Sequence, residues 1–428
     1  MMQSVNRFAR VRLNQRRGQP ELLKEMNRSR AFEILKSARI ISRPELAQQT
    51  GLSRATIAIL ADELLQMGLA QEVGLGDSTG GRPPVLLQFN PNAAYALGAR
   101  MYDHNWGIVI TNLDAQIMHR LDVLIPDDAP DTAIATLTEG VATITAQIDR
   151  ERLLPAIGLG TPGLVDVRSG VIKTAVDVGW FEVPIKEMAE KALGLQTFVA
   201  NRSKVGALAE LWYGAGRGLQ ELIYISIGTG IAAGIVHRGE LYVGANSSAG
   251  ELGHVTVLPD GPLCPCGNRG CLQQLAAGPA IANRARERLR AGGASLLQAL
   301  SAHYPELITA QMVFQAAEQG DTLAQEIIEE TATYLGIAIA NLINLFNPEL
   351  IILGGPVGRA GHVLIEPLQA EVRRRAMTHP LSAVRIVTSA LKADAGAIGA
   401  AVLVLQHASE LFFAGHPRWR TETPPTPC

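Results

Sequence analysis

The sequence feature that most constrains the fold is a cluster of three cysteines and one histidine. Residues 263–271 read Leu-Cys-Pro-Cys-Gly-Asn-Arg-Gly-Cys, and a histidine lies ten positions before the first of these cysteines. Three thiolates and one imidazole make a closed tetrahedral shell, which is typical of a structural zinc site because no position stays open for water. The sequence therefore predicts one Zn²⁺ ion that fastens a loop, bound by His254, Cys264, Cys266 and Cys271. The alternative is three buried or redox-active cysteines near an unrelated histidine.

Composition indicates a globular protein of two or three domains. The chain has 428 residues, of which 47% are hydrophobic and 18% are charged, so it can bury sizeable cores. Its longest apolar stretches, 335–348 and 395–409, are too short and too polar to span a bilayer. No secretory signal is recognisable, so we expect a cytoplasmic protein in which the cysteines bind metal and do not form disulfides. The fourth cysteine, Cys428, is expected to be an inert thiol.

The net charge of −2 excludes a uniformly basic nucleic-acid binder, but the charge is segregated along the chain. Only two glutamates accompany the basic residues of the first thirty positions. These basic residues are Arg7, Arg10, Arg12, Arg16, Arg17, Lys24, Arg28 and Arg30. Such an arm is typical of a segment that contacts an acidic partner or of a solvated tail.

The region after this arm has the pattern of a helix-turn-helix. Residues 31–36 are expected to be helical, and Ser42 then caps a second helix that carries Glu45 at its third position. Residues 50–53, Thr-Gly-Leu-Ser, supply a tight turn and another N-cap before a third helical run. The N-terminal end of that run is the predicted recognition element. The candidate DNA contacts in the two helices are Arg43, Ser53, Arg54 and Thr56. An ordinary helical hairpin with a surface turn is the alternative.

A hairpin is predicted directly after these helices. Residues 69–73 and 85–89 are expected to be strands, and residues 77–81 form the tip between them. A hairpin that follows a helix-turn-helix directly is interpreted as the wing of a winged helix domain. Arg82, set between a glycine and a proline, has no bulky neighbours and is therefore expected to enter a DNA minor groove.

From Ala96 onward the sequence alternates between strand-like and helical segments, which is typical of α/β organisation. A helix over 324–346 is expected to stop at Asn347-Pro348. The predicted strands are Trp106–Asn112, Ala156–Gly160, Thr197–Asn201, Leu222–Ile227 and Leu350–Gly354. Glycine loops follow three of these strands, at 160–163, 228–230 and 354–356, and each alone is a weak indication of a binding role.

The order of these motifs resembles the ROK family (repressor, ORF, kinase) over nearly the whole chain. The resemblance is carried by Ala-Gly-Glu-Leu-Gly-His at 249–254, by Cys-x-Cys-Gly-x-x-Gly-Cys-Leu at 264–272 and by the segment 158–166. It implies an actin-like, hexokinase-like domain of two lobes around a sugar cleft, with zinc held by the four residues named above. The winged module in front, with Gly-Gly-Arg-Pro at 80–83, resembles the transcriptional-repressor branch.

Two departures from the family's kinases predict a protein without phosphotransfer activity. The position after Asn201, where those kinases carry an aspartate as general base, holds Arg202. A guanidinium stays protonated and cannot accept the proton of a sugar hydroxyl. In addition, residues 100–105 read Arg-Met-Tyr-Asp-His-Asn where the resemblance implies a glycine-rich phosphate loop, so bulky side chains would block the approach of nucleotide phosphates.

The resemblance also implies sugar contacts. Asn201, Glu251 and His254 match the family's sugar-binding positions, and Gln273 stands where a further glutamate is usual. Because the exchanges to Arg202 and Gln273 make the cleft more positive, we hypothesise an effector that carries a phosphate or carboxylate, gripped by Arg202. The alternative is an Arg202 that pairs with Asp166 or Asp177 in a cleft that has lost its ligand.

Together these features predict a transcriptional regulator that represses carbohydrate genes. Its expected parts are a basic arm and winged helix-turn-helix over 1–92, a two-lobed sugar-binding domain over 93–410 and an irregular tail over 411–428. We expect a homodimer that binds a pseudo-palindromic operator and responds to a sugar or sugar derivative. The rival interpretations are a sugar kinase with an added DNA-binding domain and a DNA-binding regulator without effector.

Overall fold

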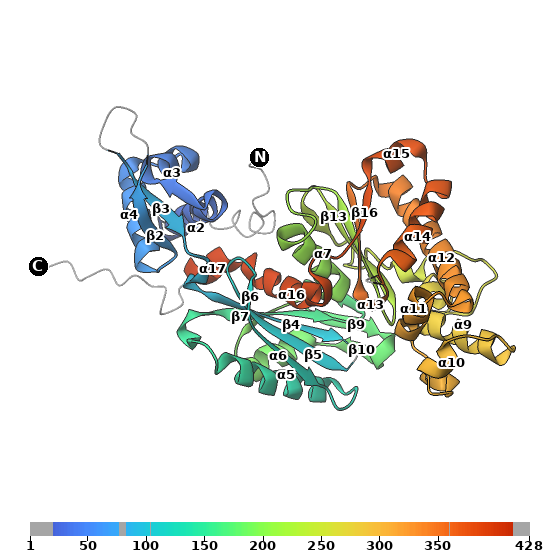
Figure 1. Ribbon diagram of the computed structural model, residues 1–428. Helices are drawn as coiled ribbons and strands as arrows, with labels where there is room; N and C mark the ends of the chain where they lie inside the picture. The colour runs from blue at the N-terminus through green and yellow to red at the C-terminus, as the bar shows by residue number, and fades with distance from the viewer. Residues whose placement is uncertain (1–19, 77–82, 103, 359, 414–428) are drawn as a thin grey trace, which may run out of the picture.

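The computed structural model describes residues 20–76, 83–102, 104–358 and 360–413, arranged as a winged module followed by two lobes, each built around a five-stranded sheet (Figure 1). No helix among these described residues is long and apolar enough to cross a membrane. The predicted α/β fold with an N-terminal winged helix-turn-helix is confirmed.

The winged module begins with a 19-residue helix over 20–38, which contains the helical segment predicted over 31–36. A three-stranded antiparallel sheet of order β1-β3-β2 completes the module. Its elements are α2 (Pro20–Ala38), β1 (Ile40–Ser42), α3 (Arg43–Thr50), α4 (Arg54–Gln66), β2 (Ala70–Leu75) and β3 (Val85–Phe89). The three predicted helical segments and the two strands of the wing are confirmed. The short strand β1, which follows α2 after one residue, was not predicted.

Local capping chemistry explains where the helices of this module start. The Ser42 hydroxyl accepts a hydrogen bond from the backbone N–H of Glu45, and the Glu45 carboxylate accepts one from the backbone N–H of Ser42 at 2.9 Å. This reciprocal pair is the predicted capping box. Ser53 caps α4 in a similar way by accepting from the N–H of Thr56 at 3.1 Å.

A partly buried ion pair joins α2 to α4. Arg28 donates two hydrogen bonds, of 2.6 and 2.7 Å, to the Glu63 carboxylate, and Lys24 lies 3.3 Å from the same group. Burial raises the pKa of Glu63, but the two cations outweigh burial and hold its pKa below the usual value. Two of the basic residues near the N-terminus are therefore used inside the module.

The first lobe holds a mixed sheet of order β11-β7-β4-β5-β6. The strands β4, β5 and β6 are antiparallel neighbours, whereas β7 runs parallel to β4 and β11. Helices α5 and α6 pack beside the sheet, and a small sheet of β8, β9 and β10 adjoins it. The bounds are β4 (Tyr95–Tyr102), β5 (Asn105–Asn112), β6 (Ile117–Leu124), α5 (Pro130–Thr145), β7 (Leu153–Thr161), β8 (Leu164–Asp166), β9 (Val171–Ala175), β10 (Trp180–Val183), α6 (Ile185–Leu193) and β11 (Gln196–Asn201).

The second lobe repeats the five-stranded plan with the order β14-β13-β12-β15-β16. Its long helix ends at Phe346, Asn347 takes a left-handed conformation, and a strand starts at Leu350 as predicted. The bounds are α7 (Arg202–Tyr213), β12 (Leu222–Ile227), β13 (Ile231–His237), β14 (Glu240–Tyr242), α8 (Gln273–Ala276), α9 (Gly278–Arg290), α10 (Leu297–Leu300), α11 (Ala310–Glu318), α12 (Thr322–Phe346), β15 (Leu350–Gly354), α13 (Gly355–Gly358), α14 (His362–Arg375), α15 (Thr378–Ala383) and β16 (Arg385–Thr388).

One nearly apolar helix, α16 (Ala395–Leu405), packs against both α7 and the first-lobe sheet. Close approach requires a glycine here, because a Cβ on Gly399 would lie 1.8 Å from the carbonyl oxygen of Val205 in α7. Helix α16 therefore ties the two lobes together at their shared centre.

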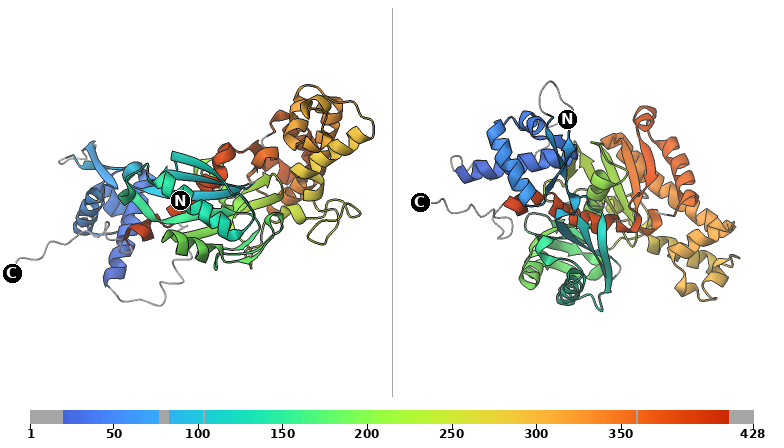
Figure 2. Two further views of the ribbon diagram at one scale, coloured as in Figure 1. Left: turned by 90° about the horizontal axis from the view of Figure 1, so that it is seen from below. Right: turned by 60° about the vertical axis from the view of Figure 1, so that its left-hand side comes forward.

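The chain returns to the winged module through α17 (Ala408–Phe413), which lies between α2 and the first lobe (Figures 1 and 2). The prediction of an irregular tail from residue 411 was wrong for its first three residues, because Leu411, Phe412 and Phe413 are helical and buried. Phe412 is fully buried, with its ring 5.4 Å from that of Phe32 on α2. One continuous hydrophobic core therefore spans the winged module, α17, α16 and the first-lobe sheet.

Candidate metal centre and ligand cleft

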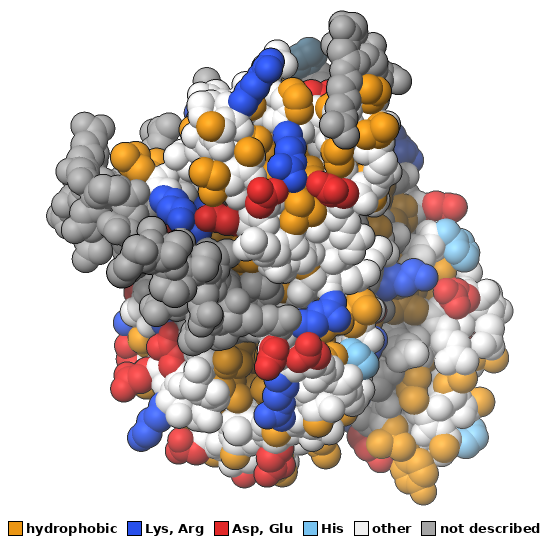
Figure 3. Space-filling model, turned by 90° about the vertical axis from the view of Figure 1, so that its left-hand side faces the viewer, with side chains coloured by type: hydrophobic (Ala, Val, Ile, Leu, Met, Phe, Trp, Pro, Cys, Tyr) orange, Lys and Arg blue, Asp and Glu red, His pale blue; other side chains and the backbone are white. Residues whose placement is uncertain are grey.

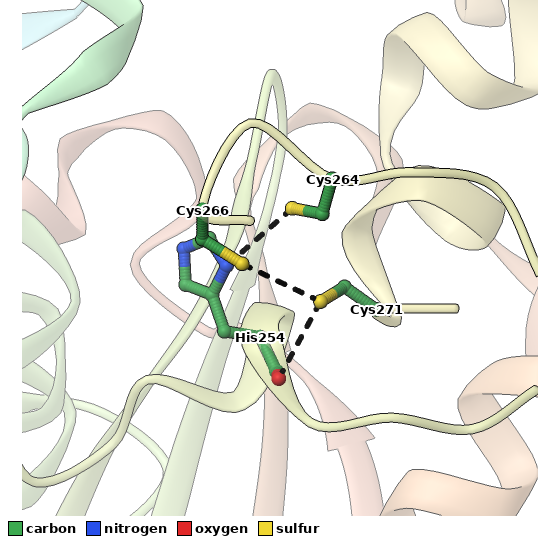
Figure 4. Close-up of side chains that lie close together, drawn as sticks. All are labelled: His254, Cys264, Cys266 and Cys271. Atoms are coloured by element: carbon green, nitrogen blue, oxygen red, sulfur yellow. Dashed lines mark hydrogen bonds between the residues drawn. The ribbon is translucent and has the colours of Figure 1, made fainter. Parts of the chain in front are cut away.

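The four predicted zinc ligands converge in space. One side-chain atom of each lies within 4.8 Å of those of the other three, and Figure 4 shows the three sulfurs gathered around one edge of the His254 ring. The Cys266 and Cys271 sulfurs are 3.7 Å apart, as are the Cys264 sulfur and the Nδ1 of His254. Tetrahedral Zn–S bonds of about 2.3 Å place two sulfurs about 3.8 Å apart. The spacing of the donors therefore fits a zinc ion.

The backbone conformation brings the four candidate ligands together. His254 ends the short 3₁₀ helix 252–254, while the cysteines lie on a tight loop in which the Cys264 N–H donates to the Asn268 carbonyl at 2.7 Å. Gly270 has a positive φ of 65°, and a Cβ there would lie 1.6 Å from the Leu258 carbonyl oxygen, so this turn requires glycine. The loop is folded against the chain that carries the histidine.

The electrostatics of the cluster favour a bound cation. Burial and the neighbouring sulfurs raise the pKa of Cys271 to about 12, because a thiolate there would be desolvated and close to other sulfur atoms. A divalent ion removes that penalty. Since His254 turns Nδ1 toward the sulfurs, its second ring nitrogen points away from them (Figure 4).

Gln273 contacts the His-Cys cluster in this structure. Its amide nitrogen lies 3.7 Å from the Cys264 sulfur, and Gln274 places its amide nitrogen 3.8 Å from the same atom. Hydrogen bonds from amides to a thiolate are typical of residues that surround a metal site. The position predicted as a sugar contact therefore adjoins the candidate metal site directly.

The other predicted sugar contacts lie on the two lobes. Asn201 ends β11, caps α7 by accepting from Ser203, and donates to the Gly163 carbonyl at 2.6 Å. Glu251 precedes the 3₁₀ helix of His254, and burial raises its pKa although nearby Lys204 acts to lower it. Asn201 is thus held by first-lobe backbone, and Glu251 is the partly buried carboxyl group opposite a lysine.

Lys204 lies beside Glu251, although the sequence did not indicate it as a site residue. Its side chain is buried, donates to the Ser247 carbonyl, and interacts with Glu251. The available signal was a single cation at the start of an otherwise apolar helical run, 205–209. A buried lysine needs a partner, which the carbonyl and Glu251 supply.

Arg202 makes the ion pair that the alternative interpretation named. Its Nη2 lies 3.2 Å from Asp177, a side chain that is 43% exposed. The Arg202 guanidinium also lies over the Tyr102 ring, with 5.8 Å between Cζ and the ring centroid. Arg202 lines a small cavity that also includes Arg100, Tyr102 and Lys392. Asp166, the other proposed partner, is bonded to Ser169 and to the backbone of Arg168 instead.

The predicted DNA contacts differ in how they are engaged. Arg54 is exposed at the start of α4, whereas Ser53 and Thr56 bond to each other through their hydroxyls at 2.8 Å. Arg43 makes ion pairs with Asp62 and Glu72, at 2.8 and 3.3 Å. Arg82 lies outside the described residues. Figure 3 looks toward the winged module and shows charges of both signs interspersed with apolar side chains on the described surface.

A winged helix-turn-helix joined to two sheet-centred lobes, with a His-Cys cluster in the second lobe, is the architecture of a class of proteins with a winged module attached to a kinase-like domain. Comparison with known proteins places the chain within that class. The chain belongs to the ROK family, whose model matches residues 97–407.

Relatives in this family include both repressors and kinases. The xylose repressor of Caldicellulosiruptor bescii is 30% identical over 390 residues, covering 91% of this chain and 97% of the repressor. A glucokinase of Thermotoga maritima is 33% identical over 311 residues, covering 72% of this chain and 96% of the enzyme. A solved ROK family transcriptional regulator, described as a homolog of the E. coli MLC protein, has a TM-score of 0.79 at 30% identity, covering 92% of this chain and all of that one.

Proposed function

We propose that the protein is a transcriptional repressor of carbohydrate genes that binds operator DNA and responds to a sugar or sugar derivative. The observation that carries the proposal is the single core that joins the winged module to the two-lobed domain through α16 and α17. The repressor and the solved regulator align over about nine-tenths of this chain, whereas the glucokinase aligns over 72%. The proposed division is a DNA-binding module over 1–92 and a sensor domain over 93–410.

In the proposed complex, α4 contacts a major groove with its N-terminal end. Arg54 is exposed there, Ser53 and Thr56 line the same turn, and the wing carrying Arg82 reaches the neighbouring minor groove. Arg43 supports α4 and β2 through its ion pairs, so its role is to position the recognition helix. A homodimer would present two such modules to a pseudo-palindromic operator.

In the sensor domain, the proposed effector contacts are Asn201, Arg202, Glu251, His254 and Gln273, with Lys204 added from the structure. The proposed zinc ion, held by His254, Cys264, Cys266 and Cys271, has a structural role. It would fix the histidine ring so that its free nitrogen can face a sugar hydroxyl. Effector binding that favours one lobe arrangement would act on the winged module through α16 and α17.

Phosphotransfer is not expected from this cleft. Arg202 replaces the general base, and the Tyr102 hydroxyl lies 3.2 Å from the point where a side chain on Gly228 would begin, so it crowds the 228–230 loop. We expect purified protein to release no ADP above background when glucose, N-acetylglucosamine or xylose is added with Mg-ATP in a coupled assay. Sugar-dependent turnover above about 0.1 per second would favour the kinase alternative, since enzymes commonly turn over at 1 per second or faster.

Operator binding tests the proposal directly. Fluorescence anisotropy with genomic fragments from the protein's own upstream region should give salt-dependent binding, because phosphate contacts release counterions. Arg54→Ala should weaken binding by about 1–3 kcal/mol, and Arg82→Ala should weaken binding and reduce the salt dependence. Arg290→Ala, an exposed arginine at the end of α9, is the matched control and should bind like the wild type.

Two results would contradict the proposal. Equal affinity of the wild type and Arg54→Ala for every fragment would remove α4 from the interface. Operator affinity that no neutral, phosphorylated or acidic sugar changes would favour the effector-independent alternative.

A further inference from the structure

The small cavity between the lobes is lined by positive charge. It has a volume of about 50 Å³ and lies where β4, the start of α7, β12 and the start of α16 meet. The described residues that line it include three cations and no carboxylate, and Asp177, which pairs with Arg202 at 3.2 Å, lies outside this lining. These cations are Arg100, Arg202 and Lys392.

Arg100 is the least satisfied of these cations. Its Nε is buried and has no hydrogen-bond partner among the described residues. Burial lowers the pKa of Arg100 and outweighs the opposing effects of Tyr224, Tyr102 and Asp122, and the like charge of Arg202 also lowers it. A charged guanidinium that is buried without a counter-charge loses its hydration, which costs free energy. A bound anion would offset this cost.

Arg100 and Arg202 both lie near the ring of Tyr102. The Tyr102 ring centroid lies 4.8 Å from the Arg100 Cζ and 5.8 Å from the Arg202 Cζ. Cation–π contact of this kind holds a guanidinium in a fixed orientation. A side chain on Gly396, in the first turn of α16, would lie 2.1 Å from the Arg100 Cδ, so the arginine stem is also fixed by close packing.

The size of the cavity limits what can enter it. One water needs about 10–15 Å³ of such space, so the cavity accommodates a group of a few heavy atoms and is too small for a nucleotide. Tetrahedral oxyanions and carboxylates match both this size and the forked donors of arginine.

We propose that this cavity is an anion-binding site for one phosphoryl-sized group, with Arg100 as its principal ligand, Arg202 and Lys392 as flanking cations, and Tyr102 as the positioning residue. This inference rests on the proposed function, in which the effector is a sugar or sugar derivative, and it narrows that effector to a phosphorylated sugar. The anion would contact the lobe junction at the start of α16, the helix that leads to α17 and the winged module.

Isothermal titration of the full chain with inorganic phosphate, at constant ionic strength in chloride, tests the site. We expect saturable binding to the wild type that Arg100→Met weakens at least tenfold and Arg290→Met leaves unchanged. Lys392→Met, at an exposed side chain, is the second variant because it does not disturb the core, and it should weaken binding severalfold. Tyr102→Leu should weaken binding as well while keeping all three charges.

Glucose 6-phosphate and glucose distinguish the sources of the anion. Tighter binding of glucose 6-phosphate than of either glucose or phosphate, lost in Arg100→Met, would support a phosphorylated sugar. Phosphate binding without this gain would support a free anion at the same site. Absence of phosphate binding, or equal binding by the wild type, Arg100→Met and Lys392→Met, would overturn the proposal.

Operator affinity measured in the same samples separates this inference from the proposed function. Anion binding that leaves operator affinity unchanged would support the site and count against effector control. A neutral sugar that releases operator while phosphate does not bind would overturn the site and support effector control.

Discussion

Removal of the metal should cost the protein several kcal/mol of stability. We expect Cys271→Ala to lower the bound zinc from one ion per chain to near zero and to destabilise the fold by about 3–5 kcal/mol, because the binding free energy of a structural zinc is folding free energy. The three remaining ligand side chains, which include the buried Cys264, would then lie close together without a cation between them. For a domain of this size that loss lowers the Tm by roughly 5–10 °C.

Zinc content by mass spectrometry and Tm by calorimetry check this prediction. Cys428→Ala is the matched control, since the same substitution outside the cluster should change neither value. Incubation with a strong chelator should reproduce the Cys271→Ala result in the wild type, and added Zn²⁺ should reverse it. A wild type that is purified with no zinc and gains no stability from added zinc would contradict the metal assignment.

The second large effect is expected at the contact between α17 and α2. Phe412 is fully buried against Phe32, and truncating a buried phenylalanine to alanine typically costs 3–5 kcal/mol. Because that contact joins the winged module to α16, Phe412→Ala should loosen the module and weaken operator binding without removing a DNA-contacting side chain. Loss of effector response is expected together with the loss of affinity.

Hydrogen exchange and operator titration measure this effect. Exchange should rise in α2 and α17 and stay unchanged in the second-lobe helix α12, which α17 does not adjoin. Phe181→Ala removes the same ring from a position that is 66% exposed and should alter neither measurement. Wild-type operator affinity and effector response in Phe412→Ala would mean that α17 does not couple the two parts.

Helix starts and wing strands could be predicted because their causes are local. Ser42 with Glu45, and Ser53 with Thr56, satisfy backbone N–H groups within three residues of themselves, so the sequence pattern alone indicates them. The convergence of His254 and the three cysteines was predictable for a related reason, since three of the four candidate ligands are close in sequence.

Other features depend on contacts between distant segments. Strand β1 is three residues long, and it forms because β3, more than forty residues later, supplies its hydrogen-bond partners. The C-terminal residues 411–413 carry no strong helical signal next to a proline-rich end, yet burial between α2 and the first lobe makes them helical. The ion pair of Arg202 with Asp177 likewise depends on the tertiary structure, since Asp166 was an equally possible partner in the sequence.

The sequence by itself determined the family, the α/β class, the winged module and the four residues of the candidate metal site, because periodicity, capping and ligand spacing are properties of short segments. Only the tertiary structure decided where the cations of the cleft lie. It brought Arg100, Arg202 and Lys392, from β4, α7 and the turn before α16, to one small cavity, and it buried Lys204 beside Glu251. Charge in a protein acts through distance and burial, and neither can be read from residues that lie a hundred or more positions apart in the chain.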